Sequence, residues 1–178
     1  MTDSDLRFHE PVSTLSEEAF VARFGGVYEH SPWVAQETFA RGLGPAHDSV
    51  DGLAAALAET VRGADQARQL ALVRAHPDLA GKAAQRGELT AESTSEQAGA
   101  GIDQCTPDEF ERFQRYNADY KARFGFPFVM AVKGSNRHLI LAAFEQRLHN
   151  DAETELHRAL DEIDRIARFR LEAMAEQR

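Results

Sequence analysis

The chain has 178 residues, 43% of them hydrophobic, and its 29 acidic side chains outnumber 20 basic ones, for a formal net charge of −9. This composition predicts a folded domain and opposes binding to nucleic acid or to anionic membranes, because both partners require a basic protein face. No apolar run approaches the length of a membrane span, and the polar N-terminus does not resemble a signal peptide. A single cysteine, Cys105, excludes an internal disulfide and is typical of a reducing compartment, so we expect a cytoplasmic protein.

The first half of the chain predicts four helices after an irregular N-terminal arm at residues 1–11. Ser16 is a suitable N-cap for the first helix, and Gly25 and Gly26 are expected to end it. Pro32 suits the first turn of the second helix. The four expected helices cover residues 16–24, 31–44, 49–62 and 64–75.

The second half predicts four more helices and one strand-like run. These helices cover residues 91–103, 106–125, 136–149 and 151–176. FPFVMAVKG, at 126–134, is interpreted as a short extended segment near 126–132. The sequence therefore predicts an all-α fold at residues 12–178, a single compact domain of about seven to eight helices.

AHPDLAGK, at 75–82, ends an alanine-rich helix with a histidine directly before a proline. The residue before a proline is pushed out of helical geometry, so His76 should lie at a helix break. This histidine is either an ordinary turn residue or a proton donor and acceptor aimed into a site. Its position alone favours the turn residue.

ESTSEQAGAG, at 92–101, places Ser93, Glu96 and Gln97 on one face of a helix, at spacings of three and four. A hydroxyl, a carboxylate and an amide on one face suit a small polar ligand. Ser93 and Glu96 also match a capping box, and the spacing alone favours this structural interpretation.

The last expected helix carries an arginine, Arg170, on its apolar stripe. The stripe consists of Leu156, Leu160, Ile163, Ala167, Arg170 and Met174. An arginine in such a position extends to solvent, pairs with another group, or lines a mostly apolar site that receives an anion or carbonyl.

Three further features of the sequence bear on a possible site. The segment FPFVMAVKG leaves backbone groups without helical partners, which suits a ureido or amide ligand unless the segment is only a buried connector. No compact ligand motif predicts a metal site. Cys105 has no basic neighbour in sequence to lower its thiol pKa, which opposes a nucleophilic role.

Four segments in order, AHPDLAGK, LTAESTSEQAGAG, FGFPFVMAVKG and IARFRL, resemble the 2-oxo-4-hydroxy-4-carboxy-5-ureidoimidazoline (OHCU) decarboxylases of urate breakdown. The resemblance extends over nearly the whole chain. It implies an all-α enzyme, commonly a homodimer, that needs no metal or organic cofactor. Such an enzyme removes the substrate carboxylate as carbon dioxide and yields (S)-allantoin.

The resemblance also implies the site. The catalytic residues would be His76, Glu96 and Arg170, the last preferred over Arg168 because the apolar stripe contains it. The substrate-binding residues would be Pro77, Ser93, Thr94, Ser95, Glu96, Gln97, Phe128, Val129, Met130, Ala131, Val132 and Arg170. At Val132 and Lys133 the sequence departs from this resemblance, because many members of the family have residues similar to the one-letter sequence CAR there.

A non-catalytic all-α module that binds a ligand or a protein partner is the alternative. The expected partners of the enzyme are a small-molecule substrate and a second copy of the chain, with no nucleic acid and no membrane.

Overall fold

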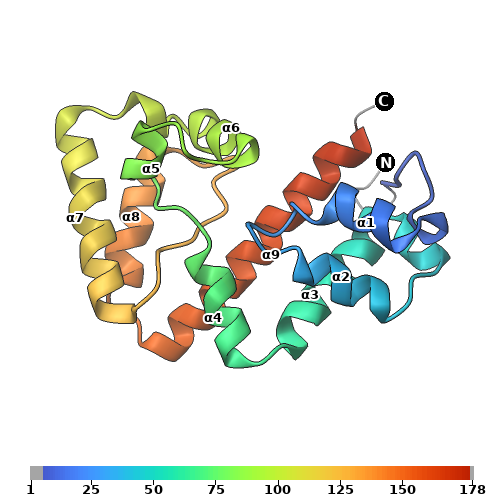
Figure 1. Cartoon of the computed structure of the whole chain (residues 1–178). Coiled ribbons are helices and arrows are strands. Elements are labelled where there is room, and N and C mark those ends of the chain that lie inside the picture. Colours follow the sequence, from blue (N-terminus) through green and yellow to red (C-terminus); the bar gives the residue numbers. More distant parts are fainter. Residues whose placement is uncertain (1–5, 177–178) are drawn as a thin grey trace. The chain divides into compact units, whose positions relative to one another are not determined.

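The computed structural model describes residues 6–176, except for the side chains of Lys82 and Ala83. Within that range it contains eight α-helices of eight or more residues and the single-turn helix α5, and it contains no strand (Figure 1). The prediction of an all-α fold is confirmed. No helix in the described range is long and apolar enough to cross a membrane.

The contacts of the chain group it into two compact units. Unit 1 runs to Ala75 and resumes at Asp164, and unit 2 consists of His76–Ile163. Helix α9 (Ala152–Glu176) therefore contributes its first part to unit 2 and its last part to unit 1.

Unit 1 is built from capped helices. Its helices before α9 are α1 (Glu17–Phe24), α2 (Trp33–Ala40), α3 (Val50–Gly63) and α4 (Gln66–Arg74). The side chains of Ser16, Ser49 and Asp65 accept hydrogen bonds from backbone N–H groups in the first turns of α1, α3 and α4, which satisfies donors that a helix start leaves unpaired. The expected cap at Ser16 is confirmed.

The described part of the predicted arm, residues 6–11, is held against the start of α3. Arg7 and Ser49 form an isolated antiparallel bridge, and the Phe8 side chain is buried. Residues 1–5 of that predicted arm lie outside the described range. Two short 3-10 helices follow, at Val12–Thr14 and Pro45–Asp48.

Unit 2 surrounds an aromatic core. Its helices before α9 are α5 (Lys82–Gln85), α6 (Ala91–Gly99), α7 (Pro107–Phe124) and α8 (Arg137–Arg147). Helices α7 and α8 lie side by side (Figure 1). They bury Phe113, Tyr120 and Phe144, whose rings meet at edge-to-face angles, an arrangement that adds to the gain from burial.

Local signals set the ends of α7. Thr106 and Glu109 form a reciprocal capping box at its start, and Gly125 adopts a left-handed conformation with φ 78° just beyond its end. Both ends agree with the predicted 106–125 helix. The segment that follows, Pro127–Val132, is neither helix nor strand.

The predicted 91–103 helix is too long. Helix α6 ends at Gly99, Gly101 is left-handed with φ 73°, and a separate 3-10 helix covers Ile102–Gln104. The two glycines lower the cost of leaving helical geometry, and the apolar Ile102 is buried by the turn that results.

Candidate functional site

His76 is the first residue after α4 and its C-cap, Ala75, and its side chain is buried, with 8% exposed. The helix ends there as predicted, because Pro77 disfavours helical geometry at the residue before it. Pro77 itself is half-buried. An imidazole in this position is a candidate acid or base, and it begins the loop at residues 76–81.

That loop is held by side chains from α6 and α7. The amide oxygen of Gln97 accepts from the N–H of Ala80 at 3.1 Å. Asn117 Nδ2 donates to the carbonyl of Leu79 at 2.9 Å, and Gln114 Nε2 donates to the carbonyl of Ala80 at 2.6 Å. These contacts satisfy backbone groups of a buried loop and restrict the path of the chain after His76.

The backbone of the loop is itself unusual. Ala80 has a positive φ of 53°, which costs free energy for any residue with a Cβ and requires support from its surroundings. A Cβ added to Gly81 would lie 2.7 Å from the Cβ of Asp78, so only glycine fits there. Asp78 also forms an ion pair with Lys121 of α7, at 2.6 Å.

Helix α6 carries the polar face predicted at residues 93–97. Ser93 and Gln97 are buried and Glu96 is half-buried, whereas Thr94 and Ser95 are exposed. The capping-box interpretation of Ser93 and Glu96 is wrong. Thr90 is the N-cap, and its hydroxyl accepts from the N–H of Ser93 at 3.2 Å, so Ser93 lies inside the helix. Ser93 and Glu96 match the capping pattern, but Thr90, three residues earlier, is an equally suitable N-cap.

Gln97 has a structural contact that the resemblance does not describe. Its amide oxygen is bound to Ala80, and its Nε2 lies 3.5 Å from the carbonyl of Asp78. The side chain predicted to bind substrate therefore holds the loop that begins at His76. This contact connects α6, with Ser93 and Glu96, to that loop.

The segment 128–132 lies in unit 2 with His76 and α6. Its residues Phe128, Val129, Ala131 and Val132 are buried and Met130 is half-buried. The Phe128 ring stacks on Phe144 of α8, with ring centroids 3.7 Å apart. The segment is thus packed through its side chains, as a connector would be, and its backbone at Val129 and Ala131 is hydrogen-bonded to buried side chains.

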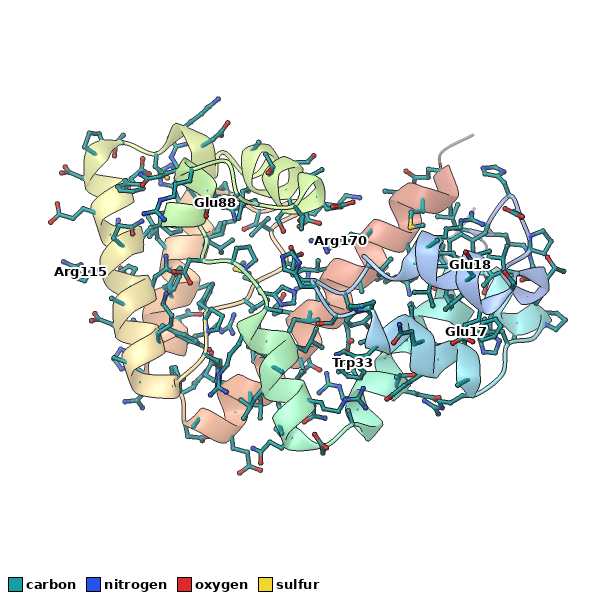
Figure 2. All side chains as sticks on the ribbon, in the orientation of Figure 1. Glu17, Glu18, Trp33, Glu88, Arg115 and Arg170 are labelled. Atoms are coloured by element: carbon teal, nitrogen blue, oxygen red, sulfur yellow. The ribbon has the colours of Figure 1, made fainter. Side chains whose placement is uncertain are left out.

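Arg170 lies on the part of α9 that belongs to unit 1 (Figure 2). It is buried, with 8% exposed, so it does not extend to solvent. Its Nη2 donates to Glu29 Oε2 at 3.0 Å, and its Nη1 donates to the carbonyl of Val27 at 3.3 Å. Glu29 is also buried, so the carboxylate compensates the arginine charge and helps to orient the guanidinium.

Cys105 is a poor nucleophile in the structure as well as in the sequence. Burial, followed by the negative charge of Glu109, raises the pKa of its thiol. A raised pKa disfavours the reactive thiolate. Among the described residues, no cluster of three or more His, Cys, Asp or Glu side chains could hold a metal ion.

Sequence reasoning missed the residues that support the site. Gln114 and Glu29 gave no local signal, since their partners are 34 and 141 residues away in the chain. For Asn117 a signal existed: it occupies the inward stripe of α7, four residues after Phe113 and three before Tyr120. A polar residue in such a stripe predicts a buried hydrogen bond.

Comparison with known proteins agrees with the resemblance. A model of the family described as OHCU decarboxylase matches residues 13–172. The 2-oxo-4-hydroxy-4-carboxy-5-ureidoimidazoline decarboxylase of Haloferax volcanii is 46% identical over 162 residues, which cover 91% of this chain and 92% of the relative. The protein of the same name from Amia calva is 40% identical and covers 90% of both chains.

Two solved structures are also similar. A crystal structure of (S)-allantoin synthase matches with a TM-score of 0.74 and 29% identity over 92% of this chain, which spans about half (52%) of that longer chain. A crystal structure of OHCU decarboxylase in the presence of (S)-allantoin matches with a TM-score of 0.69 over 92% of this chain and all of the other. The second pair is 20% identical and shows a common fold.

Proposed function

Because the chain belongs to the OHCU decarboxylase family, we propose that it decarboxylates 2-oxo-4-hydroxy-4-carboxy-5-ureidoimidazoline to (S)-allantoin in urate breakdown. The relatives support this proposal over nearly the full length of the chain. The small-molecule substrate and the carboxy-lyase reaction follow from the family.

One observation in the structure carries the proposal furthest. The buried His76 begins a loop whose backbone is hydrogen-bonded to α6, the helix that carries Ser93 and Glu96. An imidazole and a carboxylate thus belong to two segments that are tied together. Such a pair is suited to orienting a substrate and transferring a proton.

The reaction needs little from the protein beyond orientation and charge stabilisation. The bond between the ring carbon and the carboxylate breaks, and carbon dioxide leaves without the bonding electron pair. That pair spreads into the adjacent ring carbonyl or imine as an enolate-like species. A proton delivered to one face of the carbon then gives a single enantiomer.

The family resemblance gives each predicted residue a role in this scheme. Glu96 would hold the substrate hydroxyl and so orient the scissile carboxylate. His76 would lie near that carboxylate and supply the proton. Arg170 would stabilise negative charge on a ring oxygen, a contribution that depends on a fixed orientation such as Glu29 provides.

The decisive experiment generates the unstable substrate in place, from urate with urate oxidase and hydroxyisourate hydrolase. Circular dichroism then follows (S)-allantoin with and without this protein. We expect rapid appearance of the (S)-enantiomer, and we expect His76→Ala to abolish the acceleration while its helical signal stays at the wild-type level. Spontaneous racemic decay at an unchanged rate would refute the proposal and favour a non-catalytic ligand-binding module.

We also propose that the protein is a cytoplasmic homodimer. The family resemblance supports the dimer, and the single cysteine suits a reducing compartment. Sedimentation equilibrium of the purified chain tests the first statement, and cell fractionation tests the second. A monomer at micromolar concentration, or recovery outside the cytoplasmic fraction, would contradict the corresponding statement.

A further inference from the structure

The backbone of the segment 128–132 is held by two buried charged side chains that the proposed mechanism does not use. They are Arg147 at the end of α8 and Glu162 in α9. The side chain of Arg147 is 5% exposed and that of Glu162 is 2% exposed. Buried charges are costly unless they are paired, so each of these side chains is expected to have polar partners.

Arg147 reaches the segment in two ways. Its Nη1 donates to the carbonyl of Val129 at 2.7 Å. Its guanidinium lies over the ring of Phe128, 4.2 Å from the centroid. One side chain therefore fixes a backbone oxygen and the neighbouring aromatic ring together.

Glu155 of α9 fixes Arg147 in turn. Its Oε1 accepts from Arg147 Nε at 2.8 Å and from the Tyr120 hydroxyl at 2.5 Å, and its Oε2 accepts from Asn150 Nδ2 at 2.9 Å. The Glu155 side chain is fully buried. Burial and the bond to Glu155 raise the pKa of Tyr120, which keeps this hydroxyl protonated as a donor. The guanidinium is thus held in one orientation.

Glu162 supplies the second support. Its Oε2 accepts from the N–H of Ala131 at 2.9 Å, while its Oε1 pairs with Arg158 one turn earlier in α9, at 3.0 Å. Together, Arg147 and Glu162 bind the backbone at residues 129 and 131.

These two contacts are two residues apart, which is the period of extended backbone. In extended backbone the groups of successive residues point to opposite sides. An extended course of the chain over 128–132 would direct the N–H groups of residues 128, 130 and 132 away from Arg147 and Glu162. In the described part of the chain, the N–H groups of Phe128, Met130 and Val132 make no hydrogen bond.

We propose that Arg147 and Glu162 are positioning residues that present the alternate backbone groups of 128–132 to the ureido and ring amide groups of the substrate. This inference rests on the proposed function. Neither side chain touches the substrate. Each binds the far side of the segment, so that the near side keeps the spacing that a planar ureido group requires.

The test compares two variants at Glu162 with a matched control. Glu162→Leu removes the acceptor for the Ala131 N–H, whereas Glu162→Gln keeps a carbonyl oxygen that can accept it. Glu172→Leu is the control, because Glu172 also pairs with an arginine one turn earlier in α9, Arg168, at 3.1 Å.

We expect Glu162→Leu to raise KM for the ureidoimidazoline on the order of tenfold, the value of about one lost hydrogen bond. We expect Glu162→Gln to restore most of that loss and Glu172→Leu to leave KM unchanged. If Glu162→Leu does not fold, Arg147→Lys replaces it. A lysine keeps the charge beside Glu155 but lacks the planar fork that also reaches Val129, so KM should again rise.

Equal KM values in active wild type, Glu162→Leu and Arg147→Lys would overturn this inference and leave the proposed function intact. Calorimetric binding of (S)-allantoin to the same variants gives a readout that does not need turnover. A wild type that binds (S)-allantoin without turnover would refute the proposed function, and weaker binding by Glu162→Leu would still support the positioning role. A wild type that does neither would overturn both.

Discussion

Glu96 lies within the short helix α6, and Thr90 is the N-cap that precedes it, so their roles can be tested separately. Thr90 caps α6, so Glu96 is not needed to start the helix. We predict that Glu96→Gln lowers turnover on the order of 100-fold, because a misoriented substrate loses the benefit of alignment. Its melting temperature should stay at the wild-type value. The in-place circular dichroism assay and a thermal melt measure the two effects.

Thr90→Ala is the companion variant. Loss of an N-cap should lower the free energy of unfolding by about 1 kcal/mol, with turnover per folded molecule unchanged. If Glu96→Gln melts early and stays active, Glu96 has a structural role and its place in the proposed mechanism is wrong.

Variants at Arg170 and Glu29 can separate the contribution of this ion pair to stability from the role of Arg170 in catalysis. Arg170→Met removes the arginine that pairs with the buried carboxylate of Glu29, which should cost about 3–5 kcal/mol of stability and remove activity. The double variant Arg170→Met/Glu29→Met should recover much of the stability, because no buried charge is left unpaired. We predict that it does not recover activity. Urea unfolding and the enantiomer assay give the two readings, and an active double variant would reduce Arg170 to a structural role.

At the scale of elements, α7 can influence the position of His76 indirectly, because its side chains bind the loop at residues 76–81. Asn117→Ala would leave the buried carbonyl of Leu79 without its donor, at a cost of about 1–3 kcal/mol. We also predict a fall in kcat on the order of 100-fold, because small displacements of a catalytic group are costly. KM should change less, since Asn117 does not face the segment 128–132 through any described contact.

Arg115, on the outward side of the same helix, provides the control (Figure 2). Arg115→Ala should leave kcat at the wild-type value. If Asn117→Ala lowers stability but not kcat, the hydrogen bond to Leu79 supports the fold alone.

The helices and their ends were largely predictable because their causes are local. Thr106 and Glu109 cap α7, and Gly125 follows its end, all within one turn of the boundary they set. The burial of Glu155 and Glu162 in α9 was not predicted, although both residues lie next to the apolar stripe that contains Arg170. Their partners, Arg147 and the N–H of Ala131, come from elements that only the folded chain brings near.

The same distinction applies to the proposed site. The segment AHPDLAGK and the polar face formed by Ser93, Glu96 and Gln97 could be recognised in the sequence, because their side chains can take part in catalysis or ligand binding. The hydrogen bond that links them could not be predicted, since Gln97 binds a backbone group at Ala80, and any residue supplies such a group. The cap at Thr90 was overlooked because Ser93 and Glu96 fit the capping pattern equally well.

For the whole molecule, charge is the property most relevant to the substrate. The chain carries a formal charge of −9 and the proposed substrate carries a carboxylate. Like charges slow encounter, and salt screens them over a distance that falls from about 30 Å at 0.01 M to about 10 Å at 0.1 M. We predict that kcat/KM rises over this range of ionic strength. Initial rates at several sodium chloride concentrations test this, and a fall would indicate local attraction that outweighs the net charge.

A ligand held by main-chain atoms places few demands on the identity of the side chains beside it. At 128–132 this would let the sequence drift during evolution, as long as each new side chain still fills its space. Selection would act more strongly on the distant arginine and glutamate that keep the backbone in place. Substrate specificity would accordingly depend on Arg147 and Glu162, which hold the backbone of the segment. Redesign for a different ureide should begin at these two residues.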